Sequence, residues 1–121
     1  MKRTFPLFLV LWATTAQADP ATVVDVSAEQ AGQTWRFAVT LRHGDTGWED
    51  YADGWRVETP GGEVLGTREL LHPHVEEQPF TRSLGGLTLP DEVTQIVVRT
   101  RTTVTGWADD VSAPVPVPED G

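Results

Sequence analysis

The sequence of 121 residues carries a net charge of −9 at pH 7 and contains no cysteine. A chain this acidic repels nucleic acid and anionic lipid, which disfavours both as partners. Without cysteine it has no disulfide framework, thiol nucleophile or iron–sulfur site. Its single methionine, Met1, lies in an N-terminal segment that we expect to be removed on export, so a sulfur-ligated copper site is also excluded.

The N-terminus predicts a secretory signal peptide over residues 1–18. Residues 1–3 are basic, residues 5–12 are apolar, and residues 16–18 (AQA) form a small-x-small cleavage site. The apolar run is too short to span a bilayer. We therefore expect a periplasmic or secreted protein, cleaved after Ala18, that does not insert into a membrane.

Alternation of apolar and polar residues predicts strands along most of the remaining chain. The clearest signal is residues 34–42, where Trp35, Phe37, Val39 and Leu41 share one face. No window supports a helix longer than a turn or two. The other predicted strands cover residues 22–28, 54–59, a hairpin partner within 63–70, 80–84, 87–89 and 94–103.

Six to seven strands separated by Gly and Pro turns predict an all-β fold. We expect one antiparallel β-sandwich of immunoglobulin or fibronectin type III type over residues 19–113. The segment over residues 114–121 alternates proline with valine and ends in acidic residues, which is typical of a disordered, Pro-rich tail.

Two parts of the sequence resemble known proteins. Residues 84–90 (LGGLTLP) with residues 96–99 are similar to the segment that joins the last strands of a fibronectin type III or immunoglobulin-like module, although Val93 stands near the position of that family's tyrosine corner. Residues 43–55 and 72–83 resemble a group of small, uncharacterised, exported bacterial proteins. The first resemblance implies the sandwich fold, and the second implies export without indicating an activity.

The three histidines are the leading candidates for chemistry. His72 and His74 flank a proline that favours extended backbone, where residues two apart point to the same side. His43 would join them if its loop meets theirs at one end of the sandwich. Imidazoles and carboxylates without sulfur suit Cu(II) or Zn(II). The first hypothesis is a small exported protein that holds Cu(II) or Zn(II) through His43, His72, His74, Asp45 and Glu76.

An alternative hypothesis needs no metal. Trp48, Tyr51 and Trp107 lie in predicted loops, where exposed aromatic rings bind proteins or sugars, and the histidines would then be incidental. Trp55 alternates in phase with Val57, so we expect it in the core. The carboxylates of residues 45–53 offer a third option, a calcium site, but their spacing does not fit an EF-hand loop.

The remaining polar residues are expected to have structural rather than catalytic roles. Arg82 is expected to form an ion pair with Glu76, Glu77 or an acidic residue of the 45–53 loop, and its second interpretation is an anion site. Neither Ser83 nor Ser112 lies in a nucleophile elbow. A sandwich of this size also leaves little room for a deep cleft. We therefore expect a monomeric binding protein and not an enzyme.

Overall fold

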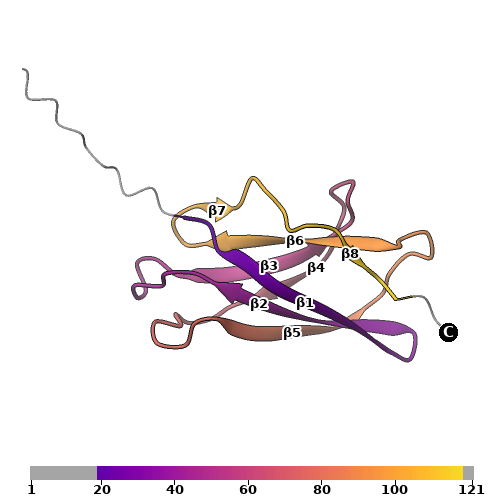
Figure 1. Cartoon of the computed structure of the whole chain (residues 1–121), viewed down its shortest axis with the longest axis horizontal. Coiled ribbons are helices and arrows are strands. Elements are labelled where there is room, and N and C mark those ends of the chain that lie inside the picture. The colour runs from indigo at the N-terminus through magenta and orange to yellow at the C-terminus, as the bar shows by residue number, and fades with distance from the viewer. Residues whose placement is uncertain (1–18, 119–121) are drawn as a thin grey trace, which may run out of the picture.

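The computed structural model describes residues 19–118, so the predicted signal peptide (1–18) and residues 119–121 lie outside it. The described residues form two antiparallel sheets that face each other (Figure 1), which confirms the predicted all-β sandwich. No helix in this part of the chain is long and apolar enough to cross a membrane.

The two sheets divide the strands as follows. The first sheet has the order β1-β2-β5, and the second has the order β4-β3-β6-β7, with β8 also paired to β6. The strands are β1 (Thr22–Ala31), β2 (Thr34–Arg42), β3 (Ala52–Glu58), β4 (Val64–Glu69), β5 (Phe80–Leu87), β6 (Gln95–Thr102), β7 (Gly106–Trp107) and β8 (Val115–Pro116).

The core lies between the sheets and follows the predicted alternation. Phe37, Val39 and Leu41 of β2 are completely buried, as are Trp55 and Val57 of β3. Burial of such side chains contributes about 1.5–3 kcal/mol each. The predicted inward faces of these two strands are therefore confirmed.

The strand prediction was wrong at the glycine pair of residues 85–86. One strand, β5, runs through both glycines where two short strands were expected. Gly86 adopts a φ of 71°, a left-handed conformation open to glycine, and the register to β2 shifts between Trp35 and Phe37. The strand accommodates both glycines through this irregularity and continues past them.

The structure also corrects the domain boundary predicted at residue 114. Val115 and Val117 pack against the core, and β8 pairs with β6 at Ile96. The N–H of Val117 donates to the Thr94 carbonyl at 2.9 Å. The prolines between the valines need no hydrogen-bond partner for their nitrogen, so this segment can pair through its valines alone.

Strand directions bring several loops to one end of the sandwich, at the left of Figure 1. β2 ends and β3 begins there, separated by residues 43–51; β4 ends and β5 begins there, separated by residues 70–79. The condition under which His43 would join His72 and His74, that their loops meet at one end of the sandwich, is therefore fulfilled. We call this region the loop end.

Candidate functional site

A buried carboxylate holds the loop end together. The side chain of Asp45 has no solvent exposure. Its Oδ1 accepts hydrogen bonds from His43 Nδ1 at 2.6 Å and from the Ala52 backbone N–H at 3.0 Å. Its Oδ2 accepts one from the backbone N–H of His74 at 2.8 Å. One side chain thus joins the loop after β2, the start of β3 and the loop before β5.

Both ring nitrogens of His43 are occupied within this network. Nδ1 faces Asp45, and Nε2 lies 3.0 Å from the backbone carbonyl oxygen of Asp19, with Asp50 Oδ1 at 3.7 Å. The residue is only 6% exposed. His43 therefore has a structural place in the loop end and presents no unengaged nitrogen to a ligand.

Gln78 forms a second bridge between the same loops. Its Nε2 donates to the His74 carbonyl at 2.8 Å, and its Oε1 accepts from the His43 N–H at 3.0 Å. Gln78 was not among the residues identified from the sequence. Its only sequence signal is its position between the histidine pair and β5.

The ring of His74 is fixed by its neighbours. It stacks on Phe80, with centroids 4.0 Å apart and planes at 11°, and it lies 4.7 Å from the ring of His72. Nη2 of Arg82 lies 2.8 Å from His74 Nε2. Because a guanidinium only donates, Nε2 accepts, and the ring hydrogen of the neutral imidazole lies on Nδ1.

The surroundings of His74 favour this neutral form. Burial is the main cause that lowers the pKa of His74, and the positive charges of Arg82 and His72 lower it further. Glu77 and Asp45 oppose the shift without reversing it. We therefore treat His74 as a neutral donor at Nδ1 near neutral pH.

A cavity of about 110 Å³ opens beside His74, between the edges of β4 and β5. Within residues 19–118, Arg68 forms no ion pair, and its Nε is buried without a hydrogen-bond partner. His74 Nδ1 is likewise buried and without a partner. We call this space the basic cavity; its lining residues are Arg68, Glu69, Leu70, Leu71, His72, His74 and Arg82.

The five predicted metal ligands are only partly brought together. His43, Asp45 and His74 share one network and His72 lies next to His74, whereas Glu76 is exposed. Over the described part of the chain, no group of three or more His, Asp or Glu residues is arranged to hold a metal ion. Hydrogen bonds within the protein engage both ring nitrogens of His43, the carboxylate of Asp45 and Nε2 of His74.

The predicted aromatic platform is divided. Trp48 is 68% exposed and contacts Tyr51 edge to face, with centroids 5.6 Å apart. Trp107 is half-buried, and the guanidinium groups of Arg56 and Arg101 lie 4.1 Å and 4.9 Å from its ring centroid. Stacked arginines therefore already cover Trp107, while Trp48 is open to solvent.

Buried Glu58 anchors the arginines on the outer face of the second sheet. It accepts hydrogen bonds from Arg56 Nε at 2.6 Å and from Arg99 Nε at 2.7 Å. Burial alone would raise the pKa of Glu58, but the hydrogen bonds from Arg99 and Arg56 outweigh it and hold the pKa below its ordinary value. This cluster is a structural ion-pair network.

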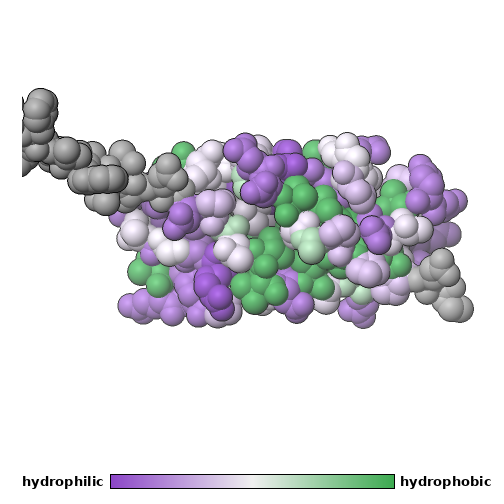
Figure 2. All heavy atoms as spheres, turned by 45° about the horizontal axis from the view of Figure 1, so that its top comes forward, coloured by the Kyte–Doolittle hydropathy of each residue, from purple (hydrophilic) through white to green (hydrophobic). Residues whose placement is uncertain are grey.

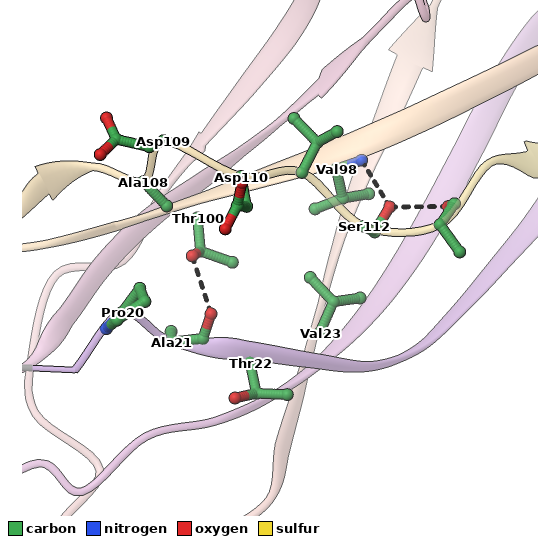
Figure 3. Close-up of a pocket in the computed structure, with 12 residues that line it drawn as sticks. Pro20, Ala21, Thr22, Val23, Val98, Thr100, Ala108, Asp109, Asp110 and Ser112 are labelled. Carbon is green, nitrogen blue, oxygen red and sulfur yellow. Dashed lines mark hydrogen bonds between the residues drawn. The ribbon is translucent and has the colours of Figure 1, made fainter.

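A larger groove of about 400 Å³ lies between the start of β1 and residues 108–113 (Figure 3). Ala21, Val23 and Val98 line its apolar part. Asp110 points from the C-terminal segment toward β1, whereas Asp109 points away (Figure 3). Figure 2 shows apolar atoms gathered in the middle of one face of the molecule, surrounded by hydrophilic side chains.

Comparison with known proteins gives one related sequence. A protein of Halomicrobium mukohataei named "Putative lipoprotein" is 50% identical to this chain over 80 residues, which is 65% of this chain and 39% of that protein. The match thus spans about two-fifths of the length of the related protein. No protein-family model matches the chain, and no solved structure matches it.

Proposed function

We propose that the protein is an exported binding module whose ligand enters the basic cavity at the loop end. The N-terminal signal-peptide pattern supports export, as does the resemblance to a protein named as a lipoprotein. A function in binding rather than catalysis agrees with the small size of the sandwich and of its cavity, which is about 110 Å³.

The observation that carries this proposal is the burial of the Asp45 carboxylate. Removing a carboxylate from water is costly, and pairing it with a histidine compensates only in part, so such a pair is weak evidence for stability alone. Here the carboxylate fixes the backbone of His74, whose ring lines the basic cavity. A network that fixes cavity walls in advance is what a binding site requires.

Amide NMR of the purified protein tests this proposal with four small probes. Inorganic phosphate, acetate, tetramethylammonium and methyl glucoside would be titrated separately at constant ionic strength. We expect at least one probe to shift the amides of residues 68–72, His74 and Arg82 saturably. The proposal fails if none does so, or if the saturable shifts instead map to the groove of Figure 3 or to Trp48.

The groove favours a second candidate function, in which an extended, basic segment of a partner protein lies along β1. The groove contains the carboxylate of Asp110, and β1 forms an edge of its sheet. An edge strand can accept a further strand, and the acidic side chain would select positive charge. A synthetic peptide of alternating lysine and valine should bind, and Asp110→Asn should weaken it. Equal binding of a glutamate–valine peptide would contradict this candidate.

A further inference from the structure

The basic cavity places positive charge inside an acidic protein. Gly66 of β4 faces β5, because a Cβ atom on Gly66 would lie 2.3 Å from Leu87 Cδ2. Arg68, two residues later, belongs to the same face of β4. Arg82 stands two residues after buried Phe80 on β5. Two arginines from opposite sheets therefore line one cavity between the sheet edges.

Within the described part of the chain, two residues that line the cavity also carry unpaired hydrogen-bond donors. Arg68 Nε and His74 Nδ1 both carry hydrogens, both are buried, and neither has an acceptor within residues 19–118. Buried donors are rarely left unpaired, because they have lost the hydrogen bonds that water would provide. A ligand that contacts the guanidinium groups of this cavity must therefore be an acceptor.

Neighbouring carboxylates leave this positive charge only partly neutralised. Glu69 is directed to Arg101, with Oε2 2.6 Å from Nη2. Glu77 reaches Arg82 Nη1 at 3.3 Å, but its side chain is 59% exposed, and solvent screens such a pair. Asp45 is occupied by His43 and two backbone N–H groups. Of the two arginines that line the cavity, Arg68 is the one that has no carboxylate partner among the described residues.

We propose that the basic cavity binds a small oxyanion, a carboxylate or phosphate group, through the guanidinium groups of Arg68 and Arg82 beside His74. This inference rests on the proposed function, since it names the chemistry of the ligand for the same site. Guanidinium groups match the paired oxygens of carboxylates and phosphates. The cavity volume of about 110 Å³ is roughly that of three to four water molecules, which suits such a group.

The test is calorimetric titration of the full chain with sodium phosphate and with sodium acetate, at an ionic strength held constant with sodium chloride. The variants are Arg68→Gln and the matched control Arg36→Gln, since Arg36 is exposed and forms no ion pair among residues 19–118. We expect saturable binding of at least one oxyanion. Arg68→Gln should weaken it roughly tenfold to a hundredfold, and Arg36→Gln should leave it unchanged.

The comparison of phosphate with acetate identifies which oxyanion is preferred. The variant Arg68→Lys tests whether binding requires the planar guanidinium group or only a positive charge. Equal losses in Arg68→Gln and Arg36→Gln would overturn the inference, because they would indicate general charge attraction. If Arg68→Gln does not fold, Arg82→Gln replaces it. If methyl glucoside or tetramethylammonium binds in the cavity and the oxyanions do not, the proposed function stands and the oxyanion inference fails. If no probe binds there, both fail.

Discussion

Asp45 Oδ2 lies 2.8 Å from the backbone nitrogen of His74, a residue 29 positions later in the chain. This contact joins the loops that precede β3 and β5, and it positions the His74 ring against Phe80 and Arg82. The buried carboxylate of Asp45 is therefore, with Gln78, one of two side chains that bridge these loops.

Replacing Asp45 by asparagine should destabilise the protein by about 3–5 kcal/mol, the usual cost of breaking a buried charge pair. Every group around the carboxylate donates, so the new NH₂ group would face another donor. Urea unfolding measures the change. The control is Asp91→Asn at an exposed position. Similar stability of the two variants would show that Asp45 is not the centre of the loop end.

Replacing Gly66 by alanine tests the close approach of β4 and β5. The added Cβ would lie 2.3 Å from Leu87 Cδ2 and 3.2 Å from Leu84 Cδ2. We expect a loss of about 1–3 kcal/mol, which is typical of overpacking. Gly44→Ala is the matched control, because a Cβ atom on Gly44 would have no neighbouring atom within 4 Å. Equal melting temperatures of the two variants would contradict this account, because they would mean that the sheet edges lie further apart than described.

Stability should fall as the pH decreases from 7 to 5. The pKa of His74 is lowered in the folded protein by burial, Arg82 and His72, so the unfolded chain binds the proton first. Stability then decreases as the pH falls below about 6.5, the ordinary imidazole value. Denaturant unfolding at several pH values should show a smaller decrease in His74→Gln than in the parent. If His74→Gln loses as much stability between pH 7 and 5 as the parent does, His74 is not the cause of the pH dependence.

At lower pH, Glu58 should add a second loss of stability. Burial raises the pKa of Glu58, but the hydrogen bonds from Arg99 and Arg56 outweigh it, and the folded pKa is lowered. The unfolded chain therefore takes up this proton first as the pH falls below about 4. Glu58→Gln should flatten the acid limb of the stability profile, whereas exposed Glu63→Gln should not. Identical acid limbs in the two variants would contradict this role.

Metal titration distinguishes the hydrogen-bonded loop end from the metal hypothesis. With His43 nitrogens and His74 Nε2 engaged inside the protein, Cu²⁺ and Zn²⁺ should bind weakly. The double variant His72→Ala with His74→Ala should change this binding little. Calorimetry that finds sub-micromolar, one-to-one binding, lost in the double variant, would instead support a metal site.

The sequence predicted the sandwich because its core positions obey a strict period of two. Phe37, Val39 and Leu41 alternate on β2, and Trp55 and Val57 do so on β3. Such a pattern depends on neighbouring residues and can be read from the chain alone. The sequence alone left open whether the two histidine loops meet, and the observed strand order brings them to the same end.

The roles of the polar residues could not be predicted in the same way. A histidine near a carboxylate fits a metal site and a hydrogen bond equally well. Only the loop geometry shows that the Asp45 carboxylate accepts a hydrogen bond from His43. Arg68 carries a charge on a strand, which normally indicates an outward face, yet it lines the cavity between the sheets. Trp107 is covered by Arg56 and Arg101 because of a cross-strand register that the sequence does not specify.

The most direct measurement is the Nε–H resonance of the Arg68 side chain in ¹⁵N NMR, assigned with Arg68→Lys and followed during titration with phosphate and then acetate. We predict a saturable shift of this resonance with at least one oxyanion, together with the amides of His74 and Arg82. A resonance that stays in place while those ions perturb other parts of the surface would contradict oxyanion binding in the basic cavity.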